Sequence, residues 1–150
     1  MLVDLLLAIA HHLLIFALLG VLVMEMMIVR PQMLPAAVLR VGRLDLIYGV
    51  LAGLVLIVGF GRVFFGIKGS AFYLGNPVFW AKIAAFAALG LLSIPPTMRI
   101  IAWRRQAEGH PGFVPAAGEV QNVKRFMHLE GFVFILIPVF AAMMARGYGN

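Results

Sequence analysis

The sequence predicts an all-α integral membrane protein, a bundle of four transmembrane helices forming one domain over residues 1–150. Composition is the first reason, because 63% of the residues are hydrophobic and 12% are charged, against about 45–50% and about 25% in soluble domains. The second reason is four continuous apolar runs, each near the roughly 20 residues that a helix needs to cross a bilayer. Since the runs do not alternate apolar with polar residues, helices are expected rather than barrel strands.

The apolar runs have recognisable ends. The first run stops at Arg30-Pro31, the second is followed by Lys68, the third opens on Pro77, and the fourth stops at Arg146. Proline suits the first turn of a helix, where its missing N–H costs nothing. The predicted spans are about 5–29, 44–65, 77–103 and 123–145. The longest connection, 104–122, is rich in glycine and proline and is expected to be irregular.

Lysine and arginine are unevenly distributed over the connections, which predicts the orientation. They flank the first and third connections and are scarcer around the second, and the stretch before the first run has none. The flanking residues are Arg30, Arg40, Arg43, Arg99, Arg104, Arg105, Lys124 and Arg125. Under the positive-inside rule, both termini are extracytoplasmic. We expect the protein in the inner (cytoplasmic) membrane of a bacterium.

Several function classes are excluded or disfavoured by composition. The net charge of +6 comes from basic residues at the ends of apolar runs, so it predicts topology rather than a nucleic-acid partner. The chain has no cysteine, which excludes thiolate metal sites and cysteine nucleophiles. It also has no glycine-rich phosphate loop, G-x-S-x-G or H-E-x-x-H motif.

Ionisable residues inside the spans are the candidate functional residues, because they are costly in lipid. His12, Arg62 and Lys82 all lie on the outer side of their predicted spans, by roughly 7, 9 and 12 Å at helical rise. A neutral imidazole binds haem iron, and two cations suit the two propionates. We therefore expect a haem b site in which His12 is the metal ligand and Arg62 and Lys82 hold the propionates.

The choice between His11 and His12 is open from the sequence. His12 is preferred because its helical face continues through Phe16 and Val23 to Arg30, while His11 shares a face with Glu25. His128 lies on the opposite side of the midplane, roughly 16 Å from His12 along the membrane normal. One iron is therefore not expected to be held by both histidines.

A second charged layer is expected at the cytoplasmic ends of the spans. Unpaired charge is expensive there, so we expect Glu25 or Glu130 within ion-pair reach of an arginine or histidine. The layer consists of Glu25, Arg30, Asp45, Arg99, Arg125, His128 and Glu130.

Three short motifs carry a family resemblance. They are His12 with the terminal Arg30-Pro31, Trp80-Ala81-Lys82 at the start of the third span, and Phe126-Met127-His128-Leu129-Glu130 in the fourth. The chain resembles a family of four-span bacterial membrane proteins of unknown function and, more distantly, HemJ-type protoporphyrinogen oxidases and CopD-like membrane domains. The resemblance implies a haem-b-binding bundle and adds His128 and Glu130 to the candidate cofactor-binding residues. Leu129 departs from the HemJ-type pattern, which has asparagine there.

Three functions follow as hypotheses. The first is a haem-b-binding redox enzyme or electron carrier acting with quinone or a tetrapyrrole. The second is a small proton-coupled transporter that uses Glu25 or Glu130, and the third is an assembly subunit without a cofactor. The small-residue pattern from Gly49 to Gly53 allows close helix packing, either within the bundle or in a homodimer.

Overall fold

The computed structural model describes residues 2–67 and 69–149, and every regular element in this part of the chain is a helix. Four of the helices are long and apolar enough to cross a membrane. The predicted fold class, an all-α membrane bundle, is confirmed. The helices in chain order are α1 (Leu2–Ile28), α2 (Pro35–Phe65), α3 (Gly69–Leu74), α4 (Pro77–Gly109) and α5 (Ala117–Ala145).

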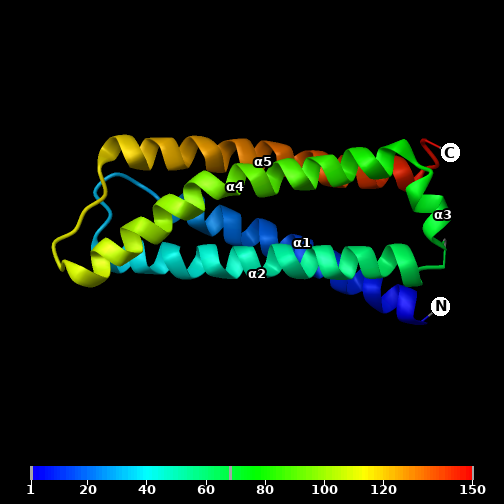
Figure 1. Cartoon of the computed structure of the whole chain (residues 1–150), viewed down its shortest axis with the longest axis horizontal. Helices are drawn as coiled ribbons and strands as arrows, with labels where there is room; N and C mark the ends of the chain where they lie inside the picture. The colour runs from blue at the N-terminus through cyan, green and yellow to red at the C-terminus, as the bar shows by residue number, and fades with distance from the viewer. Residues whose placement is uncertain (1, 68, 150) are drawn as a thin grey trace.

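The four long helices form two hairpins. α1 packs mainly on α2 and α4 mainly on α5, while α4 also crosses α2. Both chain termini and α3 lie at one end of the bundle, here called the terminal end (Figure 1). The connections 29–34 and 110–116 lie at the opposite end, called the basic end for the arginine and lysine residues near it (Figure 1). That the terminal end is extracytoplasmic stays a prediction.

The helices extend beyond the apolar runs at the basic end. α2 begins at Pro35 rather than near residue 44, and α4 continues to Gly109. Residues 104–108 are arginine, glutamine, alanine and glutamate, all good helix formers, and Arg104 pairs with Glu108 one turn later at 2.9 Å. The expected irregular connection is therefore wrong for most of its length, because a helix need not end where lipid ends.

The predicted middle connection also contains structure. Residues 69–74 form the short helix α3 between the two hairpins. Lys68, which belonged to that predicted connection, lies outside the described residues. Asn76 follows α3 and caps α4, because its side chain accepts hydrogen bonds from the N–H groups of Val78 and Phe79 at 2.8 and 3.4 Å. The same amide donates to the Tyr148 carbonyl at 3.2 Å and so attaches the C-terminal residues to the terminal end.

α4 connects the two hairpins along its length. It contains Pro95 and Pro96, and its first half runs beside α5 before the helix turns toward α2 (Figure 1). Its last turns reach α2 closely, since a Cβ at Gly42 would lie 3.0 Å from the Cδ atom of Arg104. Gly42 therefore permits this crossing, as small residues do at helix contacts.

The core is densest toward the basic end, whereas large apolar side chains cover the outside. Trp103 is buried, and its indole N–H donates to Glu119 at 2.8 Å, which joins α4 to α5. Phe16, Ile57 and Phe132 are exposed over two thirds of their surfaces, and many others resemble them. Such a surface is stable against lipid rather than water.

Candidate functional site

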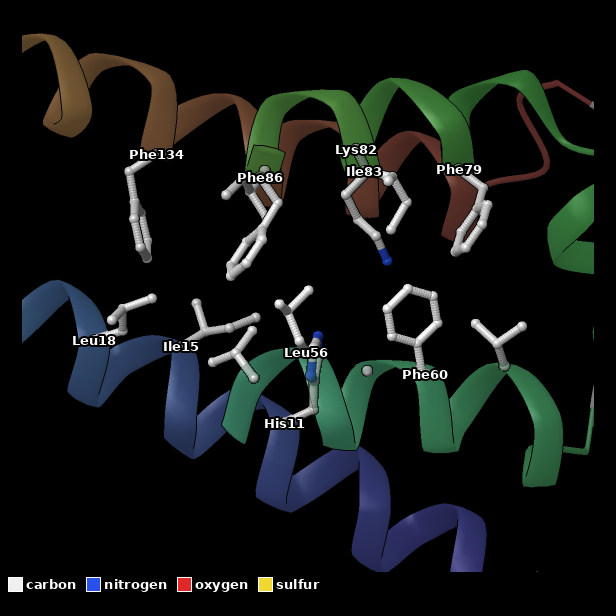
Figure 2. Close-up of a pocket in the computed structure, with 14 residues that line it drawn as sticks. His11, Ile15, Leu18, Leu56, Phe60, Phe79, Lys82, Ile83, Phe86 and Phe134 are labelled. Atoms are coloured by element: carbon white, nitrogen blue, oxygen red, sulfur yellow. The ribbon is translucent and has the colours of Figure 1, made fainter. Parts of the chain in front are cut away.

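A slot opens between the two hairpins in the half of the bundle nearer the terminal end. Its walls are apolar and largely aromatic or branched, and side chains from α1 and α2 face those from α4 and α5 (Figure 2). The enclosed interior is about 50 Å³, within about 560 Å³ of atom-free space that includes the part open to the surroundings. The lining residues are His11, Ile15, Leu18, Val55, Leu56, Gly59, Phe60, Val63, Phe79, Lys82, Ile83, Phe86, Phe134 and Ile137.

Two polar side chains enter this apolar slot from opposite hairpins. His11 comes from α1 and Lys82 from α4, and both point into the gap (Figure 2). The Nδ1 atom of His11 is buried and has no hydrogen-bond partner. Lys82 places its ammonium group 5.5 Å from the centre of the Phe79 ring, a distance at which a cation is attracted to the ring face.

The position of the His11 ring depends on a glycine of α2. A Cβ atom at Gly59 would lie 3.1 Å from Cε1 and 3.6 Å from Nδ1 of His11. Gly59 therefore makes room for the imidazole between α1 and α2. Arg62, one turn further along α2, is close enough to act electrostatically on both His11 and Lys82. Its Nε atom is buried and also lacks a partner.

The prediction that His12 faces the interior is wrong. His12 is exposed, and its Nδ1 atom lies 2.6 Å from the Ala8 carbonyl of its own helix. The face expected to be internal is external, since Phe16 and Val23 are exposed as well. In a helix that crosses lipid both faces are apolar, so a continuous apolar face does not identify the interior. The sequence did contain a signal for the interior face: His11 shares a helical face with Glu25, an acid that is costly in lipid, and Glu25 is buried in the structure.

The five predicted cofactor-binding residues are divided between different places. Arg62 and Lys82 lie near each other at the slot, as expected, but with His11 rather than His12. His128 lies in the other half of the bundle, where it is exposed and its Nδ1 atom is 2.6 Å from the Lys124 carbonyl. Glu130, also in that half, is buried.

Glu130 belongs to a second polar centre, here called the acid cluster, formed by Glu25, Asp45 and Glu130 from α1, α2 and α5. The three residues are 2%, 9% and 2% exposed. They are close enough to repel one another electrostatically. Tyr48 donates a hydrogen bond to Glu130 Oε2 at 3.1 Å, and Thr97 of α4 donates to Asp45 Oδ1 at 2.7 Å.

The expected ion pairs of Glu25 and Glu130 are wrong. Within residues 2–67 and 69–149, the ion pairs are Arg99 with Glu119 at 2.7 Å and Arg104 with Glu108 at 2.9 Å. The prediction placed acids and bases in one layer because they share a depth along the membrane normal. In the structure the bases lie around the outside of the bundle, and these acids lie inside. The described residues also contain no group of three or more His, Cys, Asp or Glu side chains placed to hold a metal ion.

Two polar centres inside a sheath of lipid-facing side chains define the class of this chain, which is an integral membrane helical bundle with buried ionisable groups. The chain belongs to the family described as "Predicted membrane protein (DUF2214)", whose model matches residues 3–149. No curated protein and no solved structure matches the chain. The expected membership in a four-span membrane family of unknown function is confirmed. The more distant resemblance to HemJ-type and CopD-like proteins stays a prediction.

Proposed function

We propose that the slot binds haem b and that His11, in place of His12, is an axial ligand. One observation carries the proposal: the imidazole of His11 lines an apolar space between helices, and its Nδ1 atom is buried without a hydrogen-bond partner. An unpaired polar atom in such a place costs free energy, which a ligand recovers when it binds there. When bound, haem supplies reversible one-electron chemistry at its iron.

The residues around the slot fit the chemistry of the group. Neutral imidazole is a common axial ligand, and the apolar walls suit a macrocycle. Lys82 and Arg62 are the cations available for the two propionates, because neither has an ion-pair partner among the described residues. A propionate near Arg62 also gives its unpartnered Nε atom an acceptor.

The size of the slot sets a condition on binding. Its enclosed interior of about 50 Å³ is smaller than a macrocycle, so the two hairpins must separate to admit one. The contacts across the slot are mainly between apolar side chains (Figure 2). The hydrogen bonds Tyr48 to Glu130 and Thr97 to Asp45, which join the hairpins, lie outside the slot. Separation at the terminal end therefore leaves these bonds intact.

The wider proposal follows from this placement. We propose that the protein carries electrons or acts as a redox enzyme in the inner membrane of a bacterium, with quinone or a tetrapyrrole as its partner. The positive-inside bias supports an orientation in which the slot lies near the extracytoplasmic face. Both classes of partner dissolve in lipid, so they can reach a slot that opens between transmembrane helices.

The visible absorption spectrum tests the proposal. Protein expressed with ample haem and purified in mild detergent is expected to show a Soret band, and His11→Ala is expected to remove it or change its position. His12→Ala is the matched control, because His12 is the adjacent histidine and is exposed. A wild-type protein without a Soret band contradicts the proposal. Loss of the band in His12→Ala but not in His11→Ala would assign the ligand to the other histidine.

A further inference from the structure

We infer that the acid cluster is a proton-exchanging site that communicates with the basic end through a groove between α2 and α4. This inference concerns the other half of the bundle and does not depend on the occupant of the slot. Its ligand is the proton, held by carboxyl groups contributed by three helices.

The first step is the balance of charge in the cluster. Three carboxyl groups meet in the interior, and no Lys, Arg or His among the described residues lies within ion-pair distance of them. The groups facing them from the neighbouring helices are the hydroxyls of Tyr48 and Thr97, which are neutral donors. Three carboxylate anions so close together in an apolar interior repel one another strongly. The cluster is therefore suited to hold protons.

The second step is an unsatisfied oxygen. Glu25 is 2% exposed, and its Oε1 atom is buried without a hydrogen-bond partner. Its neighbours Asp45 and Glu130 each accept a hydrogen bond from a hydroxyl, but Glu25 receives none from the described residues. An ionised carboxylate needs donors, whereas a protonated carboxyl carries its own. Glu25 is therefore the member best suited to exist as the neutral acid.

The third step is access. A groove of about 570 Å³ runs between α2 and α4, and its lining includes Asp45, Thr97, Arg104, Arg105 and Glu108. Asp45 belongs both to this groove and to the acid cluster, because it also lies near Glu25 and Glu130. The lining thus extends from charged residues at the basic end to one carboxyl of the buried group.

The chemistry is a simple transfer. A hydronium ion in the groove gives a proton to the Asp45 carboxylate, which leaves a water molecule and a neutral carboxyl group. When Glu25 or Glu130 has lost its proton, the proton then passes from Asp45 to that carboxylate, and Asp45 returns to its anionic form. No electron moves and no covalent bond other than the O–H bonds changes.

Infrared spectroscopy of the full chain in lipid vesicles tests the inference, because a protonated carboxyl has a C=O stretching band that an ionised one lacks. We expect this band at neutral pH and its loss on titration to alkaline pH. Glu25→Gln and Glu130→Gln should each diminish it. Glu119→Gln is the control, since Glu119 is ion-paired with Arg99. Absence of the band, or its persistence unchanged in both cluster variants, overturns the inference. Loss of the band on addition of Na⁺ at constant pH also overturns the inference, because the cluster then exchanges its protons for a metal cation.

The groove has its own test, which applies even if the glutamate variants fail to fold. Gly49 lines the groove, and a Cβ atom added there meets nothing within 4 Å. Gly49→Leu should therefore fill the groove, and its Cβ atom does not clash with the neighbouring helix. This variant should keep the protonated band but slow its response to a pH jump. Gly53→Leu is the matched control, because it is one turn away on α2, has the same open space and does not line the groove. Equal rates in both variants and the wild type overturn the assigned path.

Discussion

The slot and the acid cluster both place ionisable side chains inside the bundle, and they differ in the sign of charge. The slot holds His11 and Lys82, with Arg62 beside it, and no acid is among the described residues that line it. The acid cluster holds three carboxyl groups, and no base is within ion-pair distance of them among the described residues. A bundle selected for stability alone has a less costly alternative, which is to place apolar side chains in both regions.

The difference teaches that the polar groups of the interior are not simply a structural network. Two of the three acids in the cluster, Glu130 and Asp45, accept hydrogen bonds from Tyr48 and Thr97 on neighbouring helices, which makes them part of the packing. The slot leaves His11 Nδ1 and Arg62 Nε without partners. Removal of side chains should therefore affect stability at the cluster and ligand retention at the slot.

The largest expected effect is on stability at the acid cluster. Glu130→Ala leaves the Tyr48 hydroxyl without its acceptor and opens a cavity, so we expect a loss of about 2–4 kcal/mol in the free energy of unfolding. His11→Leu replaces a half-buried imidazole, whose Nδ1 atom has no hydrogen-bond partner, with an apolar side chain and should cost less than about 1.5 kcal/mol. Unfolding in mixed detergent micelles measures both. Equal losses would remove the distinction between the two regions.

The next effect is on ligand retention at the slot, given the proposed haem site. Lys82→Met and Arg62→Met each remove a charge-assisted contact to a propionate, worth about 1.5–3 kcal/mol, so affinity should fall about tenfold to a hundredfold. The Soret maximum should stay in place, because the axial ligand is unchanged. Haem titration measures the affinity. Arg146→Met is the control, since Arg146 is an exposed cation just after α5, and an equal loss there would show that general charge rather than these contacts retains the ligand.

The smallest effect concerns the glycine that makes room for His11. Gly59→Ala places a Cβ atom 3.1 Å from Cε1 of the imidazole, so the ring must move by a few tenths of an ångström. We expect a shifted Soret maximum and a loss in haem affinity of roughly 1 kcal/mol, or about fivefold. Gly53→Ala has open space at its Cβ and should leave the spectrum unchanged. Identical spectra for both variants would argue against His11 as the ligand.

The four membrane-length helices were predictable from the sequence, but their full lengths were not. Hydropathy identifies the segments that can lie in lipid, but it does not show whether a helix continues beyond the membrane into water. Residues 104–108 prolong α4 because they are good helix formers with an i,i+4 ion pair. Helix propensity, applied to the polar flank, was the signal that could have extended the prediction.

The candidate sites were predictable in depth but not in direction around each helix. Arg62 and Lys82 were expected near each other at one depth and are close in the structure. His12 was chosen over its neighbour from an apolar face, although every face of a lipid-spanning helix can be apolar. Glu25 was placed with cations of the same depth, yet it faces Asp45 and Glu130. Which face of a helix is interior depends on how that helix packs against the others, and the residue pattern of a single helix does not determine this packing.

All four long helices contribute to both regions, but α4 has two adjacent prolines between its two contributions. α4 carries Lys82 in the slot and Thr97 at the acid cluster, about 22 Å apart at helical rise. Between them, Pro95 and Pro96 lack the amide donors that the carbonyls of Leu91 and Leu92 otherwise use, so the rod is weakest just before Thr97. The segment of α4 before these prolines can therefore move with the slot, while the segment after them stays packed against α2. A ligand that displaces Lys82 is therefore expected to bend α4 at these prolines, next to the bond between Thr97 and Asp45.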